Sequence, residues 1–176
     1  MKAESSKLDP SSTDRLSEAS ELAAPTFKLR QILVPTDFSE PAENAIRYSN
    51  AMAKQFGAKI TLLHVIQLAI VAEEFGYVTI DDRDWVKAAQ NRLRSLGSRT
   101  IPGDELVDTI VECGVPFDVI TSTAESIKAD LIVISTHGYT GLKHVLMGST
   151  AERVVRYARC PVLVLRAQEN AAAAAA

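Results

Sequence analysis

Few cysteines, no long apolar run and no cluster of positive charge occur in this sequence, and each scarcity excludes a class of protein. Two cysteines in 176 residues cannot form a disulfide framework, and they lack the Cys/His spacing of a zinc site. We therefore expect Cys113 and Cys160 to be reduced, buried and inert. No apolar stretch has the length that a membrane-spanning helix requires, so no membrane contact is expected.

The scarcity of clustered basic residues bears on nucleic acids. The net charge is −3, and residues 1–26 contribute −2 of it with five acidic against three basic side chains, which leaves the rest of the chain at −1. A protein that binds a nucleic acid duplex needs a concentrated basic face to displace condensed counterions. No run of Lys and Arg of that kind is present, so nucleic acid is not an expected partner.

The two ends of the chain also lack recognisable targeting features. Residues 1–26 have neither the apolar core of a signal peptide nor the Arg-rich, acid-poor composition of a transit peptide. They are rich in Ser, Glu and Ala, which predicts a flexible tail. Residues 168–176 end in six alanines and are expected to be a second tail. The expected location is the cytoplasm, and the expected folded domain is a single one over residues 27–167.

Short apolar runs alternate with segments of helical periodicity between residues 27 and 167. The runs expected to be buried strands are 31–35, 59–65, 106–111, 131–134 and 162–165. Strands that are apolar on successive residues are typical of a parallel sheet covered by helices on both faces. The sequence thus predicts a Rossmann-like α/β domain with an open, doubly wound, five-stranded parallel sheet. The order of the strands in that sheet does not follow from the sequence.

Four helices are expected between these strands. The first begins after Ser39 and ends at Gly57, and the second runs over 82–96 and stops at Gly97. The third begins at Pro116, and the fourth begins at Ser149, where Ser-Thr-Ala-Glu matches a capping box. The expected inward-facing residues of the first two helices are Ala42, Ala45, Ile46, Ser49, Ala53, Phe56, Trp85, Ala88, Ala89, Leu93 and Leu96.

Two loops are distinctive, and ligands of doubly wound sheets bind beyond the strand ends where such loops lie. One loop is Pro35–Ser39 and the other runs from Ser135 to Thr150. In the second loop, Gly148 leads directly into a helix, and the first amides of a helix lack intrahelical partners. These amides, with the hydroxyls of Ser149 and Thr150, predict an anion site. The alternative to an anion site is a glycine loop that leads into an ordinary capped helix, which the residues of this loop alone favour.

The same two loops carry a family resemblance. Ser135-Thr136-His137-Gly138, nine residues, then Gly148-Ser149 resembles the Gly-x-x-Gly, nine residues, Gly-Ser/Thr signature of ATP-binding universal stress proteins. Segments 32–39, 62–65 and 160–164 are similar to the first, second and last strands of that family. The resemblance covers about residues 27–167, and Ser135 stands where the signature has its first glycine.

The resemblance implies a nucleotide site. Asp37 and Val65 would hold the adenine, 134–138 would line the ribose and phosphates, 148–150 would bind the phosphates, and Gly114 would let the backbone approach the base. The full implied set is Pro35, Thr36, Asp37, Val65, Gly114, Ile134, Ser135, Thr136, His137, Gly138, Gly148, Ser149 and Thr150. The implied ligand is ATP or AMP, and Mg²⁺ can bind through its phosphates. By its chemistry, the Asp37 carboxylate can either accept from the adenine amino group or help to hold the cation.

The expected function is adenine-nucleotide binding by a homodimeric stress-response regulator. The resemblance implies that the dimer forms by edge pairing of the last strand, Val162, Leu163, Val164 and Leu165. A slow ATP hydrolase using His137 and Asp37 is one alternative, although Lys143 lacks the spacing that places a lysine on transferring phosphates. A nucleotide-free, chaperone-like or scaffold dimer is another.

Apart from the hydrolase alternative, none of the three histidines is expected to be catalytic. His64 lies inside a buried strand, where a neutral, hydrogen-bonded histidine is the expected outcome. His137 and His144 are expected to serve in positioning or packing, because a general base must reach the attacking water and the sequence gives no distance. The connection 67–79, with Phe75 and Tyr77, is expected to pack, with a lid over the base or a partner contact as alternatives.

Overall fold

The fold is described from a computed structural model, which defines residues 28–67, 82–101, 103, 107–136 and 147–166. The expected tails and nearly all of the connection 67–79 lie outside the described residues. So do His137, Gly138, Lys143 and His144.

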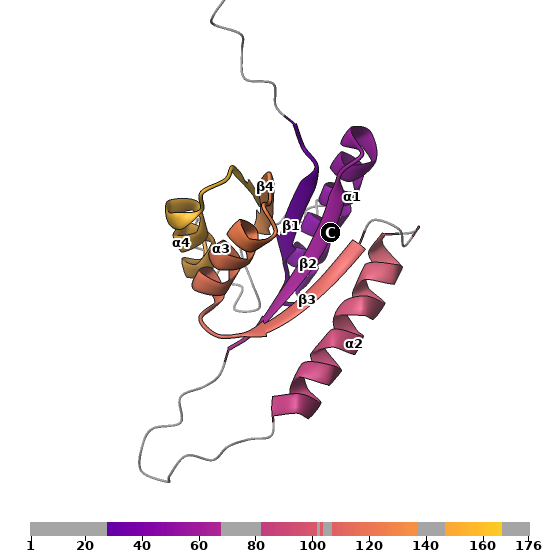
Figure 1. The fold of residues 1–176 in the computed structure, drawn as a ribbon, viewed down its shortest axis with the longest axis vertical. Coiled ribbons are helices and arrows are strands. Elements are labelled where there is room, and N and C mark those ends of the chain that lie inside the picture. The colour runs from indigo at the N-terminus through magenta and orange to yellow at the C-terminus, as the bar shows by residue number, and fades with distance from the viewer. Residues whose placement is uncertain (1–27, 68–81, 102, 104–106, 137–146, 167–176) are drawn as a thin grey trace, which may run out of the picture.

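The described residues form five parallel strands and four helices that alternate along the chain (Figure 1). The elements are β1 (Gln31–Pro35), α1 (Glu40–Phe56), β2 (Lys59–Ile66), α2 (Asp82–Thr100), β3 (Val107–Cys113), α3 (Pro116–Ser126), β4 (Leu131–Ser135), α4 (Ser149–Tyr157) and β5 (Val162–Leu165). The strand order in the sheet is β3-β2-β1-β4-β5. The predicted doubly wound parallel sheet is confirmed, and its order places β1 between β2 and β4.

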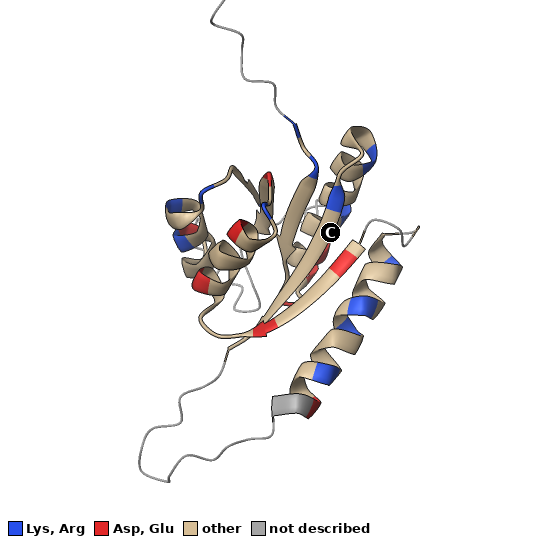
Figure 2. Ribbon diagram, in the orientation of Figure 1, with Lys and Arg blue, Asp and Glu red and all other residues tan. Residues whose placement is uncertain are grey.

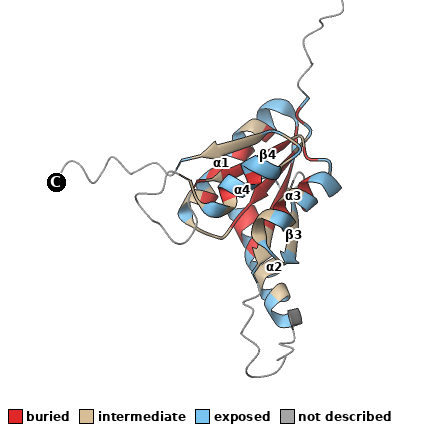
Figure 3. Ribbon diagram, turned by 90° about the vertical axis from the view of Figure 1, so that its left-hand side faces the viewer, coloured by how far each residue is buried: buried red, intermediate tan, exposed pale blue. Residues whose placement is uncertain are grey.

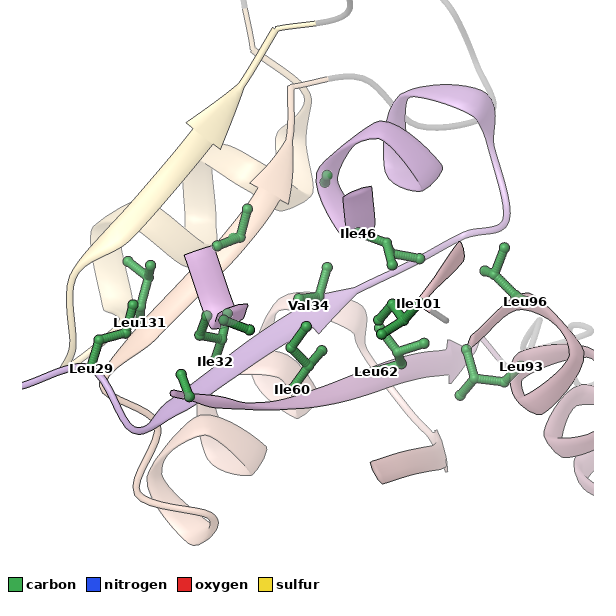
Figure 4. Close-up of a cluster of buried hydrophobic side chains, with 14 residues drawn as sticks. Leu29, Ile32, Val34, Ile46, Ile60, Leu62, Leu93, Leu96, Ile101 and Leu131 are labelled. Atoms are coloured by element: carbon green, nitrogen blue, oxygen red, sulfur yellow. The ribbon is translucent and has the colours of Figure 1, made fainter. Parts of the chain in front are cut away.

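Two hydrophobic clusters cover the two faces of the sheet. One cluster joins the sheet to α1 and α2 through residues such as Ile46, Leu62 and Leu93 (Figure 4). The other joins the opposite face to α3 and α4 through residues such as Leu63 and Ile120. Because successive strand residues point to opposite faces, Leu62 and Leu63 belong to different clusters. Figure 3 shows the buried residues along the strands and the inner sides of the helices.

Edge position explains why two strands are less buried than predicted. The central strands β1 and β4 are buried along most of their length, whereas β3 and β5 contain no fully buried residue. Both β3 and β5 lie at an edge of the sheet, where a neighbouring strand covers one side alone. The prediction that all five strands are buried is therefore wrong for β3 and β5.

The predicted N-cap and C-terminal stop of α1 are confirmed, whereas the predicted end of α2 is wrong. Ser39 caps α1, its hydroxyl accepting from the Ala42 amide at 3.4 Å, and Gly57 ends the helix with φ 68°. Gly97 does not end α2, which continues to Thr100. A Cβ at Gly97 would lie 3.4 Å from Leu62 Cδ1, so position 97 faces β2 across the interface with α2.

Four residues predicted to be buried are exposed: Phe56, Trp85, Ala88 and Cys113. Phe56, at the last turn of α1, is 49% exposed, and Trp85, in the first turn of α2, is 66% exposed. Together with Ala88, these residues lie on the solvent side of their helices, outside the cluster that covers the sheet. Cys113 is exposed because it ends the edge strand β3. Cys160 is half-buried, and this burial raises the pKa of its thiol. Among the described helices, none has the length and apolar composition to cross a bilayer.

Candidate functional site

The sheet topology creates a crevice at the carboxyl ends of β1 and β4. The chain moves outward from β1 to β2 and β3, then crosses back so that β4 lies on the other side of β1. The connections from β1 and β4 therefore leave toward opposite faces of the sheet. Doubly wound sheets bind ligands at this switch point.

A cavity of about 380 Å³ opens at this switch point, within the size range of small-molecule sites. Its walls come from the ends of β1, β2 and β4 and from the first turns of α1, α3 and α4. The lining residues are Pro35, Thr36, Asp37, Ala42, Leu63, His64, Val65, Gln67, Pro116, Ile120, Ile134, Ser135, Gly148, Ser149, Thr150 and Ala151.

One rim of the cavity is the turn Thr36–Ser39, named here the β1 turn. The Thr36 amide donates to the Leu63 carbonyl at 2.8 Å, which extends the pairing of β1 with β2 by one residue. The Thr36 hydroxyl accepts from the Phe38 amide at 3.0 Å. Asp37 Oδ1 accepts from the Ser39 amide at 3.0 Å and from the Ser39 hydroxyl at 2.5 Å. Side chains thus fix the conformation of this rim.

The facing rim is Gly148–Ala151, named here the α4 start, and its backbone fixes it. The Gly148 amide donates to the Thr136 carbonyl at 2.7 Å, and the Gly148 carbonyl accepts from the Glu152 amide at 2.9 Å. A Cβ at Gly148 would lie 2.9 Å from that Thr136 oxygen, a distance that side chains do not tolerate. Glycine is therefore required at position 148 by the fold itself.

The predicted capping box at Ser149 is wrong by one position. Gly148 is the N-cap of α4 and makes no side-chain cap, and Ser149 is the first helical residue. Because the docked Gly148 backbone sets where the helix begins, the Ser149 hydroxyl is not used as a cap. The first-turn amides lack intrahelical partners, and residues 149–151 line the cavity. This arrangement can bind an anion.

The two rims give the cavity opposite polar ends. Asp37 is the single acidic residue among the described lining residues, and none of them is Lys or Arg. The α4 start contributes the partial positive charge of a helix N-terminus, together with the hydroxyls of Ser149 and Thr150. Between the rims, the cavity wall includes the apolar side chains of Leu63, Val65, Ile120 and Ile134.

Nine of the thirteen residues predicted to bind a ligand line this cavity. Thr136 is buried and lies beside the cavity, where its carbonyl holds Gly148. Gly114 does not line the cavity; its amide donates to the Ile66 carbonyl at 3.0 Å, and a Cβ would lie 2.9 Å from Val119 Cγ2. The remaining two, His137 and Gly138, lie outside the described residues.

The structure adds lining residues that sequence reasoning missed. Pro116 and Ile120 belong to the first turns of α3, and His64 lies near the end of β2. His64 Nδ1 lies 2.8 Å from the Thr36 carbonyl, so the predicted hydrogen bond of this histidine is confirmed. The position of His64 near a strand end was a signal that it could reach the site. The described residues contain no group of three His, Cys, Asp or Glu side chains placed to hold a metal ion.

Comparisons with known proteins agree on one family. The profile of the universal stress protein family matches residues 28–166. Universal stress protein MJ0531 of Methanocaldococcus jannaschii is 33% identical over 141 residues, which cover 78% of this chain and 82% of that protein. Universal stress protein MJ0577 of the same organism is 29% identical over 164 residues, which cover 80% and 97% respectively.

Solved structures give the same result. The structure of MJ0577 superposes with a TM-score of 0.68 at 31% identity, covering 80% of this chain and 98% of that chain. The structure of UspA from Lactobacillus plantarum superposes with a TM-score of 0.60 at 25% identity, covering 79% and 99%. The profile match, the sequence relatives and the fold show that this chain belongs to the universal stress protein family.

Proposed function

We propose that this chain is an adenine-nucleotide-binding universal stress protein whose ligand is ATP or AMP, bound between the β1 turn and the α4 start. The ligand sets the conformation or partner choice of a homodimer in a cytoplasmic stress response, and residues 27–167 form its single domain. Binding is the functional event, and no step of catalysis is part of the proposal.

The polarity of the cavity is the observation that carries this proposal. Asp37 at one rim is an acceptor for the exocyclic amino group of adenine, and the amides and hydroxyls of the α4 start are donors for phosphate oxygens. The apolar wall between them, which includes Leu63 and Val65, suits the faces of a base. A ligand with an amino-bearing ring at one end and an anion at the other matches this arrangement.

A magnesium ion fits the proposal through the ligand. Mg²⁺ is commonly bound at nucleotide sites through substrate phosphates. Because Asp37 contacts the base at the other end of the cavity in this proposal, we expect the phosphates of ATP to hold the ion. We expect the ion to bind with ATP and not to the ligand-free chain.

One solved relative is relevant to ligand chemistry. A universal stress protein that is 19% identical and superposes with a TM-score of 0.57 was solved in complex with cAMP. At this identity the likeness extends to the fold, so the proposal for this chain depends on its own cavity.

Extraction and calorimetry test the proposal directly. Acid extraction of the purified protein, followed by chromatography, should release an adenine nucleotide, or titration of ligand-free protein with ATP should give saturable heat. ATP with and without Mg²⁺ is compared with AMP and GTP, and we expect both adenine nucleotides to bind more tightly than GTP. A protein that carries no nucleotide and gives no heat with any of them refutes the proposal.

The proposed homodimer forms through β5. This strand lies at the edge of the sheet beside β4, and its four residues are half-exposed. The Pro161 carbonyl accepts from the Ile132 amide of β4, and the Leu165 carbonyl accepts from the Thr136 amide just after β4. By strand alternation, the backbone groups of Val162 and Val164 therefore point away from β4. An apolar edge with unpaired backbone groups favours pairing with a second copy.

Val164→Pro tests this edge without touching the pairing with β4. Proline is tolerated on an edge strand where its missing amide would face outward. Sedimentation velocity should show a dimer for the unaltered chain and a monomer for Val164→Pro, with ATP affinity measured in parallel. An unaltered chain that sediments as a monomer at tens of micromolar would refute the dimer and leave the nucleotide proposal standing.

A further inference from the structure

Three side chains from three elements stack behind the β1 turn. The Arg92 guanidinium carbon of α2 lies 4.1 Å from the centroid of the Phe38 ring. The Phe38 ring lies 4.4 Å, centroid to centroid, from the His64 ring of β2. His64 in turn meets the Thr36 carbonyl through Nδ1 at 2.8 Å. The stack therefore begins on an exposed helix surface and ends on the backbone of a cavity residue.

The Phe38 ring lies on the opposite side of the sheet from the apolar wall of the cavity. Leu63 and Val65 pack in the cluster of α3 and α4, whereas Phe38 packs against the cluster of α1 and α2. The β1 turn thus places Thr36 and Asp37 at the cavity and inserts the next side chain behind the sheet. Phe38 and Arg92 do not line the cavity, so they can act on it only through the turn and through His64, which does line it.

The backbone of Phe38 gives a second reason to single out this residue. Its φ is 65°, in the left-handed region that bulky side chains adopt rarely and at a loss of free energy. Glycine or asparagine would adopt this conformation more easily. Such outliers persist where surrounding contacts fix them, and they are concentrated at binding sites. The contacts that fix this one are the rings and cation of the stack and the hydrogen bond to the Thr36 hydroxyl.

We infer that Arg92, acting through Phe38, and His64, acting through its contact with the Thr36 carbonyl, are positioning residues that fix Thr36 and Asp37 at the rim of the ligand cavity. The inference rests on the proposed function, because it names residues that set the affinity of the same site. Arg92 on the surface of α2 would thus raise ligand affinity from the opposite side of the sheet, although it does not line the cavity. A purely structural stack would affect stability and leave ligand affinity unchanged.

Arg92→Gln, with Arg94→Gln as its control, separates the two roles. Both arginines are exposed residues of α2, a helix that carries several basic side chains (Figure 2). The control removes the same charge without removing the cation over Phe38. Calorimetry with ATP should show affinity about threefold to tenfold lower for Arg92→Gln and within about twofold of the unaltered chain for Arg94→Gln. Equal affinities for the two variants would overturn the inference.

A double-substitution cycle tests whether Arg92 acts through Phe38. In a Phe38→Leu background, Arg92→Gln should lower ATP affinity by less than about twofold, because the ring that transmits its effect is gone. Phe38→Tyr, which keeps the ring, should retain the affinity of the unaltered chain. Effects of Phe38→Leu and Arg92→Gln that simply add would show that Arg92 acts by another route, against the inference.

Hydrogen exchange of the ligand-free protein keeps this inference separable from the nucleotide proposal. The Phe38 amide is bonded to the Thr36 hydroxyl, and the Ser39 amide is bonded to Asp37. Arg92→Gln should raise the exchange rates of these two amides about threefold or more over those of Arg94→Gln. If the unaltered chain binds no nucleotide, the proposed function is refuted. The exchange rates then still test whether Arg92 fixes the β1 turn. Unchanged exchange would overturn the positioning role whatever the ligand.

Discussion

The two rims of the cavity are built from different kinds of contact. In the β1 turn, the Thr36 hydroxyl, the Asp37 carboxylate and the Ser39 hydroxyl all form hydrogen bonds that fix the rim. In the α4 start, the Gly148 backbone docks on the Thr136 carbonyl and no side chain caps the helix. The first rim depends on which side chains are present, and the second depends on one glycine that brings two backbones together.

This difference matches the two tasks of the proposed site. Helix amides and hydroxyls bind any phosphate in the same way, so the α4 start supplies affinity for an anion and little discrimination. A carboxylate in a fixed position discriminates between bases, because it accepts from an amino group and repels a carbonyl oxygen. Substitutions in the β1 turn should therefore change selectivity between bases, and substitutions in the α4 start should abolish nucleotide binding.

The largest expected effect comes from Gly148→Val. A side chain here meets the Thr136 carbonyl oxygen at 2.9 Å, so one backbone must move and the α4 start with it. We expect ATP binding to be lost and the free energy of unfolding to fall by about 1–3 kcal/mol. Calorimetry and chemical denaturation measure the two effects, with Gly148→Ala as the milder variant should valine prevent folding.

Gly57→Ala is the control for that loss of stability. Gly57 has φ 68°, and a Cβ added there would meet nothing within 4 Å, so alanine adds backbone strain away from the cavity. We expect about 1 kcal/mol lower stability and unchanged ATP affinity. Retained ATP affinity in a folded position-148 variant would show that the α4 start does not bind the phosphates.

Asp37→Ala should change selectivity more than affinity. Removing the carboxylate takes away the acceptor for the adenine amino group, and we expect the preference for ATP over GTP to fall about tenfold. Competition between the two nucleotides measures it. Ser39→Ala keeps the carboxylate but removes one contact that fixes it, so this variant should lose less of the preference for ATP than Asp37→Ala. Selectivity that survives in Asp37→Ala would place base recognition elsewhere.

A pair of serine substitutions compares the two rims directly. Ser39→Ala removes the side-chain cap of α1 and should lower the free energy of unfolding by about 1 kcal/mol. Ser149→Ala should change it by less than about 0.5 kcal/mol, because Ser149 is already inside α4 and caps nothing. Chemical denaturation of both variants checks the contrast. Equal losses would contradict the account of the α4 start as a backbone-built rim.

The smallest expected effect is that of Ser135→Gly. Ser135 lines the cavity at the end of β4. Removing its side chain should enlarge the cavity there and tighten ATP binding about twofold to threefold. Titration calorimetry measures the change. Weaker binding would mean that the hydroxyl bonds the ligand, and unchanged binding would place Ser135 outside the contact surface.

The strands and the two site loops could be predicted from the sequence because their signals are local. Continuous apolar runs such as 31–35 and 131–134 are buried by any arrangement that covers both faces of a sheet. The cap at Ser39 and the stop at Gly57 were likewise predictable, since each depends on a few neighbouring residues. The Ser149 capping box was an equally good local pattern, yet the contact of Gly148 with Thr136 overrode it.

By itself, the sequence determined the fold class and the pair of loops, because periodicity and short-range chemistry act along the chain. Its family resemblance also implied nine of the residues that line the cavity. The tertiary structure alone decided the strand order that brings β1 beside β4 and the docking that places Gly148 at the helix cap. It also decided the stack of Arg92, Phe38 and His64. These features depend on contacts between residues far apart in the sequence, and such contacts form only when the chain folds back on itself.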